Sequence, residues 1–128
     1  MGKNIMVVDD DQLFHDLYTE MLEETEYRLI HTYDGDEALQ ALEQEKPDLI
    51  ILDMVMDMVT GDTFFLYLKS MPECTDIQVI IISNNSKRSS KSLKDIDPNL
   101  LYIDKADLTK ERLIEEIKAK IGSEICSI

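Results

Sequence analysis

Five short apolar segments recur along the chain, and they restrict its fold more than any other feature. They are rich in Ile, Val and Leu, and three of them show no alternation of apolar and polar residues. Runs of this kind are typical of strands that are buried on both faces of a parallel sheet. The expected strands are Ile5–Val8, Arg28–Thr32, Leu49–Leu52, Val79–Ile82 and Leu100–Ile103.

Amphipathic stretches separate these strands and predict helices, because their apolar residues recur at the spacing of one helix face. Asp11 can cap the first helix and Thr109 the last. Pro47 ends the second helix and Pro72 ends the third. A weaker pattern at Lys87–Asp95 predicts a short or mobile helix, since its serines compete with the backbone for hydrogen bonds. The other expected helices are Asp11–Glu24, Gly35–Glu45, Asp62–Met71 and Thr109–Ile121.

This alternation of strands and helices predicts an α/β fold with right-handed crossovers and helices on both faces of the sheet. A length of 128 residues fits a single domain, which we expect to span residues 1–128. No apolar stretch approaches the roughly 18 residues that a membrane span needs, and the start lacks the apolar core of a signal peptide. We therefore expect a cytoplasmic protein that does not engage a membrane.

The charge of the chain narrows the choice of partners. Lys and Arg number 13 against 27 Asp and Glu, which leaves a formal net charge of −14. Such a domain repels phosphate, so we expect no direct binding of nucleic acid. Residues 83–94 are the exception, because they hold four basic residues and no acid. This segment is either a solvated face or a docking surface for an acidic partner.

Three consecutive aspartates, Asp9, Asp10 and Asp11, follow directly behind the apolar run Ile5–Val8. Like charges about 4 Å apart repel by roughly 1 kcal/mol in water and by about 4 kcal/mol at an effective dielectric near 20. The cluster is therefore either solvated or neutralised by a cation. Ligands of open α/β sheets bind outside the carboxyl ends of the strands, where Asp9 and Asp10 lie. We expect Asp11 to cap the following helix instead.

Three further strands add polar residues to the same edge, with Asp53, Ser83 and Lys105 at or just beyond their ends. Three carboxylates require a cation, and Mg²⁺ prefers hard oxygen ligands together with phosphate oxygens and water. Lys105 can contact a phosphoryl oxygen as a point charge, and Ser83 can donate a hydrogen bond to another. Asp53 can attack phosphorus and carry the phosphoryl group, in a transfer that depends mainly on positioning and charge neutralisation.

Four motifs that occur in order, each at a strand end, identify a family: "VVDDD", "LIILDMVMDMVTG", "VIIIS" and "YIDK". Through them nearly the whole chain resembles the receiver domain of two-component response regulators. The resemblance implies a doubly wound, flavodoxin-like (βα)5 fold whose five-stranded parallel sheet has the order 2-1-3-4-5. It also implies a phosphoacceptor signalling domain, which catalyses only its own phosphorylation and dephosphorylation, rather than an enzyme.

The resemblance assigns a role to each residue of the edge. It implies that Asp53 is the phosphoacceptor and that Lys105 contacts the phosphoryl group. It further implies that Mg²⁺ is bound by Asp9, Asp10, Asp53 and the backbone carbonyl of Val55.

Ser83 and Tyr102 match the two switch positions of the family. Phosphorylation would draw in Ser83 and turn Tyr102 inward, which would change the surface around the fourth helix, the fifth strand and the fifth helix. The implied phosphoryl donor is a phosphohistidine on a sensor histidine kinase or a histidine phosphotransfer protein. The implied recipient of the signal is a downstream protein target or an output domain.

Three positions depart from the family pattern. Asp57 stands where proline is usual, and Asn84 stands where a small residue is common. Ala106 replaces the proline that typically follows the lysine, and the bond before that proline is generally cis in the family. A cis bond before Ala106 costs about 2.5–4 kcal/mol, so either the site tolerates this strain or a different loop holds Lys105.

These departures keep other interpretations open. The chain is a stand-alone receiver or the receiver of a longer protein, or it is an interaction module that has lost regulated phosphotransfer. A hydrolase of the haloacid-dehalogenase type fits poorly, because Val55 stands where that family has a second acid. His15 and His31 are expected to be exposed polar residues rather than ligands.

Overall fold

The computed structural model describes residues 2–56, 60–84 and 96–122. The helix expected at Lys87–Asp95 and the departure at Asp57 lie outside these residues. The described helices are α1 (Gln12–Met21), α2 (Gly35–Gln44), α3 (Gly61–Ser70) and α5 (Lys110–Ile121), with the short 3₁₀ turns η1 (Pro72–Cys74) and η2 (Lys105–Asp107). The strands are β1 (Asn4–Val8), β2 (Arg28–Thr32), β3 (Leu49–Leu52), β4 (Gln78–Ser83) and β5 (Leu101–Asp104).

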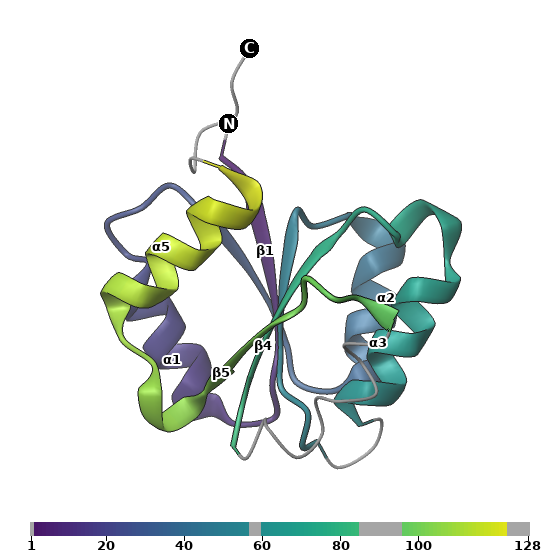
Figure 1. Cartoon of the computed structure of the whole chain (residues 1–128), viewed down its shortest axis with the longest axis horizontal. Coiled ribbons are helices and arrows are strands. Elements are labelled where there is room, and N and C mark those ends of the chain that lie inside the picture. Colours follow the sequence, from purple (N-terminus) through teal and green to yellow (C-terminus); the bar gives the residue numbers. More distant parts are fainter. Residues whose placement is uncertain (1, 57–59, 85–95, 123–128) are drawn as a thin grey trace.

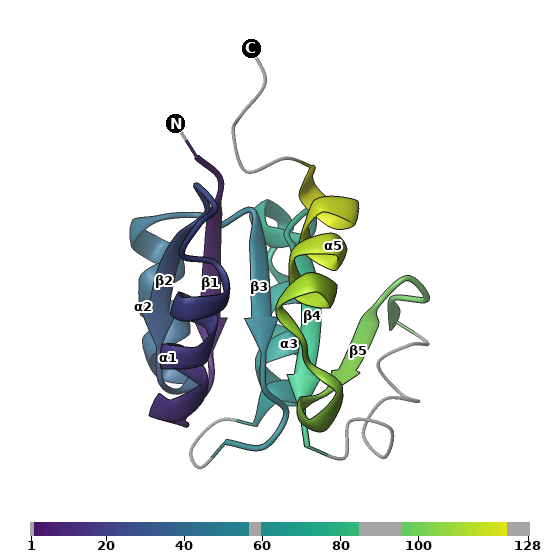
Figure 2. The same ribbon diagram turned by 90° about the vertical axis from the view of Figure 1, so that its left-hand side faces the viewer.

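The five strands form one parallel sheet in the order β2-β1-β3-β4-β5, as Figure 2 shows from the side of α1 and α5. The register pairs Ile5 of β1 with Leu29 of β2 and with Leu49 of β3. This sheet, with helices on both faces, confirms the fold class that the sequence predicted. The strand order reverses between β1 and β3, and such a reversal is where open α/β sheets bind their ligands.

Helices cover the two faces of the sheet in pairs, with α1 and α5 on one face and α2 and α3 on the other (Figure 1). The residues of β1 alternate between these layers, because successive side chains of a strand point to opposite faces. Ile5 and Val7 pack in the core with Tyr18 of α1, whereas Met6 and Val8 pack in the core with Phe64 of α3. Burial on both faces explains why the central strands are apolar throughout.

Side-chain caps begin three of the helices. Asp11 accepts a hydrogen bond from the backbone N–H of Leu13 at the start of α1, at 3.0 Å. Thr109 caps α5 in the same way. Both caps were predicted, and each satisfies a backbone donor that a helix start leaves without a partner. Helix α1 ends at Met21, three residues before the predicted end. None of the described helices has the length and apolar character that a membrane span requires.

Candidate functional site

The carboxyl ends of four strands bring distant residues to one edge of the sheet. The register pairs Val8 with Leu52 and Leu52 with Ile81, so the residues that follow these strands emerge side by side. Ser83 is paired with Asp104 in the same way. All five polar residues predicted at this edge are gathered there: Asp9, Asp10, Asp53, Ser83 and Lys105.

Three carboxylates form the centre of the site. One oxygen from each of Asp9, Asp10 and Asp53 lies within 4.8 Å of the other two. Asp9 and Asp53 are buried, whereas Asp10 is exposed. Burial raises the pKa of Asp9, and the charge of Asp53 adds to this effect, while the N–H of Asp11 and the ammonium of Lys105 oppose it.

The carboxylates suit a hard divalent cation. Asp9 Oδ2 is buried without an aligned hydrogen bond, which leaves a lone pair available inside the site. Hard oxygen ligands of this kind are the ones that Mg²⁺ and Ca²⁺ take in proteins. The side chain of Asp10 is the one open to solvent, so an ion could enter from its side.

Lys105 lies between two of the acids. Its Nζ is 3.0 Å from Asp9 Oδ2 and 3.5 Å from Asp53 Oδ2. The same ammonium lies over the ring of Phe14, 4.1 Å from the centroid, and only 6% of the lysine side chain is exposed. Carboxylates on one side and an aromatic face on the other hold the cation in the buried site.

A different loop holds Lys105 in place of the cis bond typical of the family. No peptide bond among the described residues is cis. Lys105 is instead the first residue of η2, and the side chain of Asp104 accepts a hydrogen bond from the N–H of Ala106 at 3.0 Å. This geometry resolves the two alternatives that Ala106 left open, because the lysine reaches both acids without the strained bond.

The hydroxyl of Ser83 connects β4 to the acid cluster. Its Oγ donates a hydrogen bond of 2.7 Å to Asp53 Oδ1 and accepts one of 3.3 Å from the N–H of Met54. The N–H of Val55 also donates to Asp53 Oδ1, at 3.3 Å, while the side chain of Val55 is exposed. Asp53 is therefore held from two sides, by β4 and by the turn that follows it.

Tyr102 lies on the neighbouring strand β5, outside the acid cluster. It is partly buried and packs against the core on the side of α2 and α3. Burial and the charge of Asp97 raise the pKa of Tyr102 to about 12. Asn84, directly after Ser83, is exposed.

Gly61 is a site residue whose role the sequence reasoning missed. A Cβ atom at this position would overlap the carbonyl oxygen of Asp53 and would lie 2.6 Å from the Cα of Met54. The N–H of Gly61 donates to the carbonyl of Met54 at 3.1 Å, so α3 begins against the backbone of the acid-bearing turn. The glycine that closes "LIILDMVMDMVTG" was the available signal.

His15 was wrongly expected to be exposed. It is 1% exposed, and its Nε2 lies 2.7 Å from the backbone carbonyl oxygen of Asp9. Its spacing of three residues from buried Tyr18 was the signal that it shares the inner face of α1. His31 is exposed, as expected.

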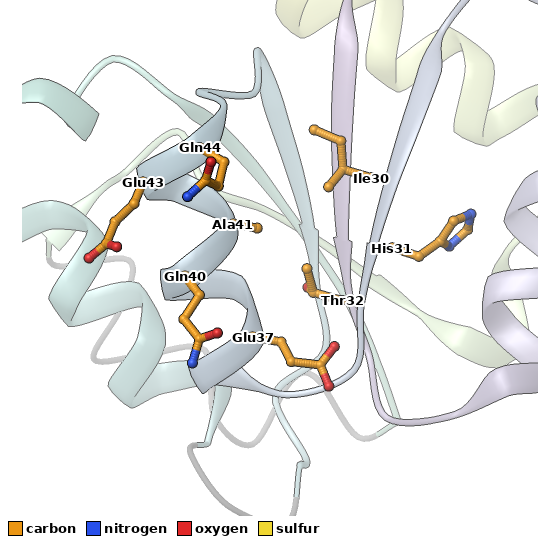
Figure 3. A pocket seen from close by; sticks show the side chains of 8 residues that line it. All are labelled: Ile30, His31, Thr32, Glu37, Gln40, Ala41, Glu43 and Gln44. Atoms are coloured by element: carbon orange, nitrogen blue, oxygen red, sulfur yellow. The ribbon is translucent and has the colours of Figure 1, made fainter.

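A groove of about 570 Å³ lies elsewhere, between β2 and α2 (Figure 3). Its lining includes Thr32, Glu37, Gln40 and Gln44, and it contains none of the clustered site residues. The groove and the acid cluster are therefore separate features of the surface.

Comparison with known proteins identifies one family. The model of the response regulator receiver domain matches residues 5–118. The chain is 30% identical over 122 residues to the polar-differentiation response regulator DivK of Brucella anthropi, covering 95% of this chain and 98% of that protein. The DivK protein of Brucella ovis matches with the same identity and coverage.

Solved structures share the fold. The chemotaxis protein CheY4 of Vibrio cholerae superimposes with a TM-score of 0.83 at 18% identity, covering 94% of this chain and 99% of that one. The receiver domain of a sensor histidine kinase from Pseudomonas aeruginosa superimposes with a TM-score of 0.82 at 19% identity, covering 96% and 100%. That receiver domain was solved with a magnesium ion coordinated in its active site cleft.

Proposed function

This chain belongs to the response regulator receiver domain family, and from that premise we propose that it accepts a phosphoryl group on Asp53. The geometry that supports this proposal is a set of contacts around Asp53: Ser83 donates to it, Lys105 pairs with it, and Lys105 also pairs with Asp9. The family makes the chain a domain of two-component signalling. The proposal adds that it promotes its own phosphorylation and dephosphorylation.

We propose Mg²⁺ as the cofactor, held by Asp9, Asp10, Asp53 and the backbone carbonyl of Val55. The convergence of three carboxylate oxygens within 4.8 Å supports this assignment. The magnesium ion in the related receiver domain of a sensor histidine kinase also supports it. When bound, the ion would neutralise charge that develops on the phosphoryl oxygens.

The proposed transfer needs little from the protein except geometry and charge. A carboxylate oxygen of Asp53 attacks phosphorus, and the bond between phosphorus and the donor histidine nitrogen breaks with its electron pair on nitrogen. No proton must leave Asp53 when its carboxylate is already ionised. Lys105, now 3.5 Å from Asp53 Oδ2, would contact a phosphoryl oxygen.

The proposed switch begins at Ser83. Its hydroxyl now donates to Asp53 Oδ1, and a phosphoryl group on Asp53 would offer it a more highly charged acceptor. Movement of Ser83 would open space for Tyr102, which is partly buried on the adjacent strand. The surface around the expected fourth helix, β5 and α5 would then change; the residues expected to form that helix, Lys87–Asp95, lie outside the described part of the chain.

We propose a phosphohistidine donor on a sensor histidine kinase or a histidine phosphotransfer protein. The output would be a downstream protein target or an output domain. The compartment expected from the sequence is the cytoplasm, where a donor phosphorylated at the expense of ATP would be available.

Incubation with Mg²⁺ and acetyl phosphate, followed by intact mass measurement, tests the proposal. We expect one phosphoryl adduct on the wild type and on Asp62→Asn, which alters an exposed aspartate outside the acid cluster. We expect none on Asp53→Asn. An adduct that persists in Asp53→Asn would refute Asp53 as the acceptor. A wild type that remains unmodified would favour the interaction module.

A further inference from the structure

A pair of histidines links the edge strand β2 to the main chain of the acid cluster. His15 Nδ1 lies 2.6 Å from His31 Nδ1, and His15 Nε2 lies 2.7 Å from the carbonyl oxygen of Asp9. We propose that His31 acts through His15 as a positioning residue for Asp9 and so strengthens the binding of Mg²⁺. This inference rests on the proposed role of Asp9 as a metal ligand.

The hydrogen-bonding groups allow one arrangement of protons when both rings are neutral. The carbonyl oxygen of Asp9 can only accept, so His15 Nε2 carries a hydrogen. His15 Nδ1 is then an acceptor, and His31 Nδ1 must donate to it. The hydroxyl of Thr19 donates to the carbonyl oxygen of His15 at 2.9 Å, which agrees with its longer separation of 3.4 Å from His31 Nε2.

Packing leaves the ring of His15 little freedom to turn. The imidazole is buried, and it lies against the ring of Tyr33, with 4.1 Å between centroids and 30° between planes. On another side it contacts the ring of His31, at 4.9 Å. Figure 3 shows that His31 projects from β2 on the side opposite α2. The hydrogen bond from His31 therefore selects the tautomer and the orientation of a ring that packing already confines.

Two further hydrogen bonds join the end of β2 to the end of β1. The N–H of Asp9 donates to the carbonyl of Thr32 at 3.2 Å, and the hydroxyl of Thr32 donates to the carbonyl of Val7 at 2.9 Å. His15 holds the other main-chain group of Asp9, its carbonyl. Because Asp9 Oδ1 also accepts from the N–H of Asp11 at 2.9 Å, the direction of Asp9 Oδ2 follows from these fixed groups.

Removal of the His31 imidazole would leave His15 Nδ1 as a buried acceptor without a donor. The substitution also removes the ring that packs against His15, so the imidazole could turn or admit water, and the carbonyl of Asp9 would lose its defined partner. Groups that orient a ligand from outside the coordination shell change metal affinity by about 10–100-fold when removed. His31 acts one residue further away, so we expect a smaller loss, of about threefold to tenfold.

The tautomers of the two rings provide the first test, because the chain contains no other histidine. Partial burial of the ring and the neighbouring imidazole hold the pKa of His31 below its usual value, so NMR at pH 8 observes the neutral ring. We expect imidazole ¹⁵N spectra to show hydrogen on His15 Nε2 and on His31 Nδ1. Hydrogen on His31 Nε2 instead would overturn the proposal.

Mg²⁺ titration at pH 8 provides the second test, read from backbone amide shifts. His31→Ala should weaken binding by about threefold to tenfold, whereas His31→Asn should bind nearly as the wild type, because its amide nitrogen can take the place of Nδ1. Arg28→Ala is the matched control, since Arg28 lies on the same strand and pairs with Glu45, directly after α2, at 2.7 Å.

The outcomes separate this inference from the proposed function. Unchanged Mg²⁺ affinity in His31→Ala, or equal losses in His31→Ala and His31→Asn, would overturn the positioning role while the proposed function stands. Failure of the wild type to bind Mg²⁺ would refute both the proposed cofactor and this inference, whatever tautomers are observed. If His31→Ala does not fold, the tautomers of the wild type still decide, because hydrogen on His31 Nε2 would overturn the proposal.

Discussion

Lys105 and Asp9 form a buried ion pair, with 3.0 Å between Nζ and Oδ2 and with 6% and 2% of the two side chains exposed. The pair joins the turn after the fifth strand to the end of the first, and it places a cation next to two of the three clustered carboxylates, Asp9 and Asp53. Breaking a buried pair by removing one partner leaves an uncompensated charge, which is more costly than the pair itself is worth. The loss of Lys105 would leave the acids without their ammonium, whereas the loss of the Asp9 charge would leave Lys105 paired with Asp53, at 3.5 Å.

Lys105→Ala should slow the phosphorylation of Asp53 by acetyl phosphate by at least about tenfold, because one positive group that faces the phosphoryl oxygens is lost. Without the ammonium the three acids repel one another, so the metal-free melting temperature should fall and Mg²⁺ should raise it more than in the wild type. Intact mass time courses and thermal denaturation measure both effects.

Lys110→Ala, which breaks an exposed pair with Glu24, is the control and should change neither the phosphorylation rate nor the melting temperature. Normal phosphorylation of Lys105→Ala would contradict the assigned role.

Asp9→Asn should stabilise the metal-free domain at neutral pH by a small amount. Burial raises the pKa of folded Asp9 above its unfolded value of 3.8, so the folded state binds more protons than the unfolded state between these two values. The free energy of unfolding therefore falls as pH rises through this window. The amide of the Asp9→Asn variant does not ionise, so the variant does not lose this stability. Lys105 would keep Asp53 as a partner, at 3.5 Å.

Urea denaturation between pH 3 and pH 8 would measure the effect of Asp9→Asn. The advantage of the variant should shrink as pH falls and should be lost below the unfolded pKa, where Asp9 of the wild type is protonated in both states. Asp36→Asn, at an exposed position in α2, serves as the control. A variant less stable than the wild type at neutral pH would show that the Lys105 contact outweighs the burial of the charge.

Ser83→Ala should lower the free energy of unfolding by about 1–2 kcal/mol, because a buried donor and acceptor are lost at Asp53 Oδ1 and at the N–H of Met54. Ser83→Thr keeps the hydroxyl and should lose less. Urea denaturation measures the difference, with Ser70→Ala as an exposed control, because the Ser70 hydroxyl donates to the backbone carbonyl of Tyr67. Equal stability of the alanine and threonine variants would argue against a hydrogen-bonding role.

The same serine tests the proposed switch. Ser83→Ala should still be phosphorylated on Asp53, but the ring resonances of Tyr102 should no longer respond to phosphorylation. NMR of the wild type and the variant, each with and without acetyl phosphate, provides the comparison. A full response of the Tyr102 resonances in Ser83→Ala would show that Tyr102 responds to phosphorylation without the Ser83 hydroxyl.

Gly61→Ala should destabilise the domain by about 1–3 kcal/mol, the usual cost of overpacking a buried position. The added methyl group meets backbone atoms of Asp53 and Met54, which cannot turn away as a flexible side chain would. Urea denaturation and the amide shifts of Asp53 measure the effect. Thr63→Ala, on an exposed turn of the same helix, is the control. Wild-type stability of Gly61→Ala would show that α3 can shift without cost.

Local patterns in the sequence were enough to predict the strands, most helix starts and the edge where the polar residues meet. An apolar run such as Leu49–Leu52 has no stable position except between two layers of helices. The caps Asp11 and Thr109 act on backbone groups a few residues away, so their effect can be predicted without the fold. Parallel strands end at the same edge, which brings Asp53 and Ser83 together once the strands are assigned.

Only the tertiary structure decided how closely these residues meet. Lys105 reaches Asp9 from a 3₁₀ turn, and the family pattern of a proline after the lysine had suggested a different backbone. His15 is buried because Asp9 and His31 satisfy both its nitrogens, and Gly61 is needed because another segment passes against it. Periodicity and capping depend on neighbours in the chain, whereas these contacts join segments that are far apart in sequence, so their distances are set only when the whole sheet is assembled.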